Sequence, residues 1–178
     1  AHLDLHSFPT RRSSDLGRNL LLGSHIIADG SLSRTAGVEI GGTANPITCA
    51  NLEVAKKSLR LMDPQKMKDR LNLVSMPNWY QCIDQALAKS AMKRADIDYL
   101  AILHIKRSGH ESLLKDLGLT PEQTIYLENY GHIGQIDQIL SLHLGLAQGK
   151  VVDGSVICML AAGIGYVWAA NIIKWGDA

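Results

Sequence analysis

The alternation of short apolar strands with helices between residues 98 and 173 is the feature that most constrains the fold. Strands are predicted over 98–104, 124–128, 155–161 and 165–173, with helices near 108–117 and 133–148 between them. Farther upstream, 20–27, 38–40 and 59–62 predict strands, and Asp63-Pro64 and Met76-Pro77 each predict the start of a helix. This order predicts an α/β fold, with a mixed β-sheet covered by helices and a closing hairpin.

Two of these predicted strands end at a histidine. His104 follows the strand over 98–103, and His132 follows the strand over 124–128 through a glycine turn. Ligands and reacting groups of α/β sheets gather at the carboxyl ends of parallel strands. The sequence therefore predicts that the two imidazoles meet at one edge of the sheet and form a site.

The first residues of the chain predict something other than structure. Residues 4–16 read DLHSFPTRRSSDL, which resembles, without a gap, the conceptual translation of a short-read sequencing adapter. The only phenylalanine, Phe8, lies in this stretch, and no methionine precedes Met62. We therefore expect residues 1–16 to be a non-native, adapter-derived tail, and the authentic sequence to begin near Gly17, inside its gene.

Composition argues against several classes of function. With 18 basic and 17 acidic residues the formal net charge is +1, so nucleic acid and membrane partners are not expected. No apolar run approaches the roughly 20 residues of a membrane span. The three cysteines, Cys49, Cys82 and Cys158, lie far apart, which favours free thiols of a cytoplasmic protein and predicts neither a metal site nor a cofactor.

Four segments in order resemble the second half of the thiolase-like condensing enzymes, most closely ketoacyl-acyl-carrier-protein synthase III. They are DYLAIL with His104 and a helix ending KDLGL, then ENYGHIGQID, GLAQGKVVDGSVICMLAAG and AAGIGYVWAANIIKW. The resemblance implies half of a thiolase-like fold. Residues 46–178 would be the C-terminal domain and 17–45 a remnant of the N-terminal half, and the full-length parent would be a homodimer.

The resemblance also implies a reaction. In that family a cysteine holds an acyl group as a thioester. A histidine and an asparagine then donate hydrogen bonds to the thioester carbonyl of malonyl-acyl carrier protein while CO2 leaves. By position His104 is the family's histidine, but His132 stands where the family has asparagine. An imidazole can donate a hydrogen bond there, the role we favour, or act as a general base.

The expected function is thus a decarboxylative Claisen condensation that uses acyl-CoA and acyl carrier protein substrates, in fatty-acid or polyketide-type biosynthesis. The alternatives are an acyltransferase that forms esters or amides on the same scaffold, or a non-catalytic acyl- or protein-binding relative. A cysteine at a helix start in the first half would exclude the non-catalytic alternative.

Four further residues have weaker roles by resemblance. Gly163 and Gly165 are expected to form the loop that shapes the oxyanion hole, and Lys106 and Arg107 to contact the acidic face of a carrier protein. No cysteine of the chain stands at a helix start as the family's nucleophile does. We therefore expect the nucleophile to lie in a missing N-terminal half, and this fragment alone to be inactive.

Overall fold

The computed structural model describes residues 17–177, so the predicted adapter tail lies outside the described residues. Its strands are β1 (Arg18–Ala28), β2 (Ala36–Val38), β3 (Leu59–Leu61), β4 (Tyr99–Ile102), β5 (Val156–Gly163) and β6 (Val167–Asp177). Its α-helices are α2 (Leu52–Ala55), α3 (Pro64–Lys89), α4 (Arg107–Leu117) and α5 (Asp137–Ala147). Short 3-10 turns are η1 (Gly30–Leu32), η2 (Arg94–Asp96), η3 (Pro121–Gln123) and η4 (Gly134–Ile136).

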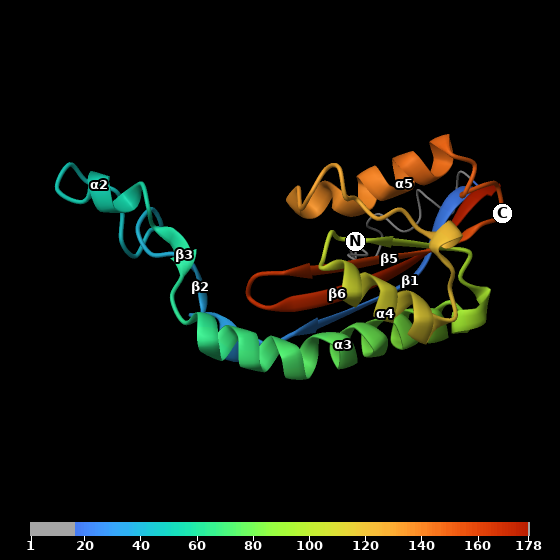
Figure 1. The fold of residues 1–178 in the computed structure, drawn as a ribbon, viewed down its shortest axis with the longest axis horizontal. Coiled ribbons are helices and arrows are strands. Elements are labelled where there is room, and N and C mark those ends of the chain that lie inside the picture. Colours follow the sequence, from blue (N-terminus) through green and yellow to red (C-terminus); the bar gives the residue numbers. More distant parts are fainter. Residues whose placement is uncertain (1–16, 178) are drawn as a thin grey trace, which may run out of the picture.

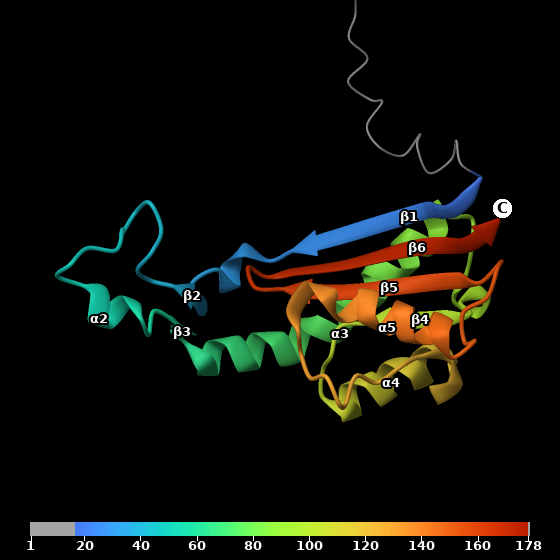
Figure 2. The ribbon, with the colours of Figure 1, turned by 90° about the horizontal axis from the view of Figure 1, so that it is seen from above.

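One mixed sheet organises these elements, in the order β1-β6-β5-β4 (Figure 2). β4 runs parallel to β5, while β6 is antiparallel to both β5 and β1. The α/β class, the mixed sheet and the closing β5–β6 hairpin are therefore as predicted. α3 lies against one face of the sheet and α5 against the other (Figure 1).

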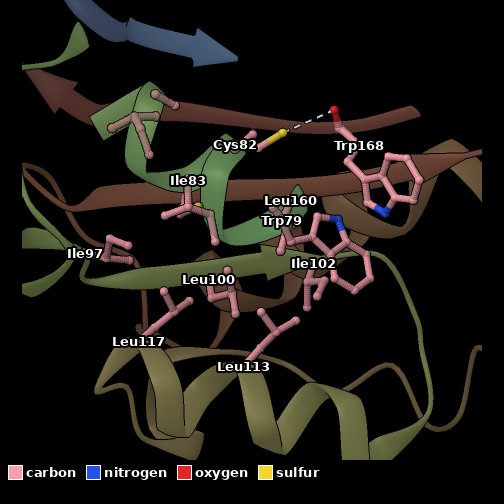
Figure 3. Packing of buried hydrophobic residues seen from close by; sticks show 14 of the residues in the cluster. Trp79, Cys82, Ile83, Ile97, Leu100, Ile102, Leu113, Leu117, Leu160 and Trp168 are labelled. Atoms are coloured by element: carbon pink, nitrogen blue, oxygen red, sulfur yellow. Dashed lines mark hydrogen bonds between the residues drawn. The ribbon is translucent and has the colours of Figure 1, made fainter. Parts of the chain in front are cut away.

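Alternate residues of β4 point to opposite faces of the sheet and enter different cores. Leu100 and Ile102 pack with α3 and α4 in the larger cluster, where Figure 3 shows them near Leu113 and Leu117. Tyr99 and Ala101 pack instead with α5 in a smaller cluster. Because both faces are covered, all four β4 residues are buried, as is typical of a parallel strand between helix layers.

The edge strand β1 falls within the segment that the sequence assigns to a remnant of the other half of the fold. In the structure it pairs with β6 along most of its length and so belongs to the same sheet as the C-terminal strands. β2, β3 and α2 lie beyond the end of this sheet, where β2 and β3 pair only with each other (Figure 2). The origin of residues 17–45 in the first half of a longer fold stays a prediction.

The two helices predicted on either side of Pro77 are one helix, α3. A proline inside a helix leaves the carbonyl four residues earlier, that of Leu73, without its donor. Pro77 and Leu73 are both exposed, so the break in the hydrogen-bond ladder lies on the solvent-exposed side of the helix. The helix continues because Trp79 and Ile83 bury the opposite face, and the Trp79 indole donates to the Ala161 carbonyl oxygen at 3.0 Å.

The predicted strand over 124–128 is wrong. Only Thr124 meets the sheet, through an isolated parallel bridge to Leu100 and a 2.8 Å hydrogen bond from its hydroxyl to the Leu100 carbonyl. The chain then turns on itself, since Glu128 N–H donates to the Tyr126 carbonyl at 2.8 Å. The helix predicted from residue 133 accordingly begins later, at Asp137, after the η4 turn.

The position of α5 on the sheet depends on a close approach at Gly145. A Cβ atom there would lie 2.8 Å from the Tyr99 ring, which is fully buried and whose hydroxyl donates to the Ser141 carbonyl at 2.7 Å. Overpacking a site of this kind costs about 1–3 kcal/mol. We therefore expect Gly145→Ala to lower the free energy of unfolding by that amount in urea titrations.

Gly109, inside α4, is the matched control for this substitution. The nearest atom to its added Cβ is the flexible end of Ile105, at 3.3 Å. Because alanine is the better helix former, Gly109→Ala should leave stability unchanged or raise it by up to about 1 kcal/mol. Equal effects of the two substitutions would show that the Tyr99 contact does not position α5.

Candidate active site

One buried carboxylate connects the two predicted site histidines. His104 lies just beyond the end of β4, and its backbone N–H donates to Oδ2 of Asp137 at 2.8 Å. His132 lies in the loop before η4, and its ring Nδ1 is 2.6 Å from the same oxygen. That the two imidazoles meet in one site stays a prediction. The structure brings the His104 backbone and the His132 ring to one carboxylate oxygen near the carboxyl end of β4. It does so through Asp137, the first residue of α5.

Asp137 is an ionised carboxylate. Burial of its fully enclosed side chain opposes ionisation, but hydrogen bonds from the His104 and Ile133 N–H groups and from His132 hold its pKa below the usual range. The Ile133 N–H reaches Oδ1 at 2.8 Å, so both carboxylate oxygens are occupied. The positive end of the α5 dipole favours the same charge state.

His132 also borders an open pocket of about 500 Å³ beside the β5–β6 hairpin. Gly163 and Ile164 of the hairpin turn line the other side, and Gln138 is held there by a 3.1 Å hydrogen bond to the Leu160 carbonyl. The other residues that line the pocket are Gly134, Gln135, Ala161, Ala162 and Val167. His132 is the one titratable residue of the described chain in this lining.

His104 and Gly165 are not among the residues that line this pocket. The His104 ring packs instead on Tyr126, with 4.9 Å between ring centroids. Its Nδ1 is buried and has no hydrogen-bond partner within residues 17–177. A buried ring nitrogen without a partner is costly in an ordinary core and marks a position that needs an explanation.

Lys106 and Arg107 differ in how far they are free to meet a partner. The Arg107 guanidinium lies 4.3 Å from the centroid of the Tyr126 ring and forms a 2.8 Å ion pair with Glu128. Lys106 is exposed and immediately precedes α4. Arg107 thus helps hold the loop at the site, and a carrier-protein contact stays a prediction for both residues.

Sequence reasoning missed Asp137, although the chain carries a signal for it. It is the only aspartate, glutamate, lysine or arginine between Glu128 and Lys150, in a segment that otherwise reads as apolar and amide-bearing. A single carboxylate in such a segment, five residues after a histidine, is not the pattern of a solvated charged face. Its connection to the His104 backbone depends on tertiary contacts and carries no sequence signal.

Among the described residues 17–177, no group of three or more His, Cys, Asp or Glu side chains is arranged to hold a metal ion. Over the same residues, no helix has both the length and the apolar character needed to cross a membrane.

Known proteins of one kind are similar to this chain in sequence. The β-ketoacyl-[acyl-carrier-protein] synthase III of Microcystis aeruginosa is 26% identical over 159 residues, which are 88% of this chain and 46% of that protein. The enzyme of the same name from Deinococcus deserti is 33% identical over 92 residues, or 51% of this chain and 26% of that protein. The chain thus spans about half the length or less of these relatives.

A solved structure has the same fold. The 3-oxoacyl-[acyl-carrier-protein] synthase III of Aquifex aeolicus superposes with a TM-score of 0.67 at 18% identity, over 89% of this chain and 45% of that one. The sheet with its two helix layers is accordingly half of a thiolase-like fold. The family model for the C-terminal part of 3-oxoacyl-[acyl-carrier-protein] synthase III matches residues 87–175, which include β4, both histidines, Asp137 and the hairpin. This chain therefore belongs to the 3-oxoacyl-[acyl-carrier-protein] synthase III C-terminal family.

Proposed function

We propose that this chain is the C-terminal half of a condensing enzyme that joins an acyl thioester to malonyl-acyl carrier protein with loss of CO2. The observation that carries the proposal is the arrangement of His104 and His132 on one carboxylate, at the carboxyl end of β4. His132 faces an open pocket beside the hairpin, which offers room for a substrate carbonyl. Membership of the synthase III family supports the same reaction.

The chemistry requires donors fixed in this way. Loss of CO2 leaves an enolate, whose negative charge develops on the thioester oxygen. Preorganised donors aimed at that oxygen lower the barrier more than most other single contributions. The His132 ring is held by Asp137, so this donor does not have to reorganise when charge develops. The His104 backbone is held by the same carboxylate, and its ring packs on Tyr126.

A second candidate function is acyl transfer to a hydroxyl or amine acceptor. The specific observation that favours it is the pairing of His132 with a buried aspartate, an arrangement that in many hydrolases supports a general base. An alcohol or amine acceptor must lose a proton when it attacks, and a general base removes that proton. Decarboxylation generates the carbon nucleophile directly, so it needs no general base.

The complete enzyme in this proposal has a first half that supplies the nucleophilic cysteine and covers the open side of α5. Ile133, Ile136 and Ile139, at and just before the start of α5, are 44%, 56% and 55% exposed, which is unusual for three isoleucines so close together. Acyl-CoA and acyl carrier protein are the proposed substrates, with Lys106 the better placed of the two basic residues for the carrier. The proposed assembly is a homodimer.

The experiment joins this chain to the upstream half of its reading frame and supplies acyl-CoA with malonyl-acyl carrier protein. Acyl-CoA-dependent release of CO2 and a 3-oxoacyl product on the carrier protein, identified by mass, are expected. Formation of an ester or amide without release of CO2, when alcohols and amines are offered, would replace condensation with the second candidate.

The isolated 178-residue chain should not form an acyl-enzyme. Burial raises the pKa of the Cys158 thiol to about 12 and also raises that of Cys82, so neither supplies a thiolate at neutral pH. Cys49 is exposed in a turn, outside any helix start. Intact mass should therefore be unchanged after incubation with acyl-CoA.

A short native treatment with iodoacetamide provides the control, because it should alkylate Cys49 and spare the two buried thiols. An acyl adduct on any of the three cysteines that is then released to an acceptor would show that the nucleophile lies within this chain.

A further inference from the structure

We propose that Asp137 is a positioning residue that fixes the His132 ring with its Nδ1 proton toward the carboxylate, so that His132 meets the substrate through Nε2 and donates there as an imidazolium. The inference rests on the proposed function for the identity of the substrate oxygen. The orientation of the ring stands on the structure alone.

The carboxylate cannot turn away from His132. Backbone N–H groups from two separate segments hold it, with Ile133 on Oδ1 and His104 on Oδ2, both at 2.8 Å. The Asp137 side chain is fully buried, so no water competes for either oxygen. The 2.6 Å contact to Nδ1 of His132 is therefore a directed and fixed interaction.

This contact determines which ring nitrogen carries a proton. A carboxylate only accepts hydrogen bonds, so Nδ1 must be the donor. In the neutral ring Nε2 then bears a lone pair, which repels an enolate oxygen. In the imidazolium both nitrogens are donors, and Nε2–H forms a charge-assisted hydrogen bond. An asparagine amide at this position would donate in every charge state, so His132 changes the chemistry of the position.

Asp137 also supplies the charge that an imidazolium needs. It is the only carboxylate that pairs with His132 among the described residues. The other residues that line the pocket, from η4, α5, β5 and β6, are uncharged. His104 faces Asp137 through its backbone N–H.

The chemical step balances without proton transfer to or from His132. The bond between the malonyl methylene carbon and its carboxylate breaks, CO2 leaves, and the electron pair moves to the thioester oxygen, which accepts a hydrogen bond from Nε2–H. The enolate carbon then attacks the carbonyl carbon of the acyl-enzyme thioester. A carbon–carbon bond forms, the carbon–sulfur bond breaks, and the cysteine leaves as a thiolate.

The orientation is testable on this chain as it stands, with 15N-labelled histidine and NMR of the ring nitrogens. Neutral His132 is expected to show a protonated Nδ1 and a bare Nε2. Asp137→Asn should abolish that preference, and Asp153→Asn, at an exposed aspartate paired with Arg18, should leave it unchanged. A wild-type His132 with its neutral proton on Nε2 would overturn the proposal, whether or not the Asp137→Asn variant folds.

The catalytic consequence is testable on the enzyme that carries both halves. Asp137→Asn is expected to lower kcat by about tenfold with little change in KM, because the ring then loses its charge partner and donates from a neutral Nε2–H, which is a weaker donor to a developing negative charge. A raised KM with unchanged kcat would overturn the positioning role. Absence of any condensation by the wild type would instead remove the proposed function, and the NMR result on His132 would stand.

Discussion

In the enzyme that carries both halves of the fold (the two-half enzyme), His132→Ala is expected to lower kcat by about 10²–10³-fold, or about 2.7–4 kcal/mol. The reason is that it removes one hydrogen-bond donor to the developing enolate oxygen. KM should change much less, since the interaction strengthens only as charge develops. The measurement is CO2 release from malonyl-acyl carrier protein at saturating acyl-CoA.

His132→Asn and His143→Ala separate the possible causes of that loss. An asparagine amide still donates a hydrogen bond, so most of the activity should remain in His132→Asn. His143 is exposed on α5 and does not line the pocket, so its replacement by alanine should have no effect. An asparagine variant as slow as the alanine variant would show that His132 transfers a proton, and would favour acyl transfer to an alcohol or amine.

Trp168→Ala is expected to destabilise the chain by about 3–5 kcal/mol, the range found for removal of buried aromatic side chains. Trp168 of β6 is 1% exposed and packs in the cluster between α3 and the sheet (Figure 3). This loss is a large share of the roughly 5–15 kcal/mol that stabilises a typical domain. Guanidinium unfolding followed by circular dichroism measures it.

Leu73→Ala is the control, because Leu73 lies on the water-facing side of α3 and is 67% exposed. Its effect should remain within about 0.5 kcal/mol. A Trp168 variant as stable as the Leu73 variant would mean that β6 and α3 do not form the core described above.

The sequence predicts the sheet and the hairpin well because their signals are local. β5 and β6 are apolar runs joined by a glycine-containing turn, and Gly165, with a φ of +154°, adopts a conformation that side-chain-bearing residues avoid. The parallel strand β4 is buried on both faces and therefore reads as a continuous apolar run.

Two predictions are wrong, the strand over 124–128 and the new helix start at Pro77. Both are wrong because contacts with other parts of the fold override the local sequence signal. Residues 124–128 are as apolar as a strand. After the bridge at Thr124, however, the backbone forms local hydrogen bonds within this segment and does not pair with the sheet. Pro77 is a strong local signal for a helix start, yet the buried face of α3 continues across it. Local propensity is a weak guide where packing of a longer face decides the outcome.

The sequence pointed to the two histidines and not to the carboxylate, and the role of the histidines in one site stays a prediction. His104 and His132 stand at chain positions that the topology brings together. Asp137 acts through a backbone N–H at one strand end and a ring nitrogen in a separate loop, and only the folded chain brings these two together. Its presence changes His132 from a substitute for an amide into a group whose charge state controls its role.

The most direct test of the account is the pH dependence of CO2 release by the two-half enzyme and by its His132→Asn variant. If His132 donates as an imidazolium, the wild-type rate falls as pH rises and the ring loses its proton, while the asparagine variant lacks this fall. A wild-type rate that rises with pH, with acyl transfer that proceeds without CO2, would contradict both the donor role and the condensation.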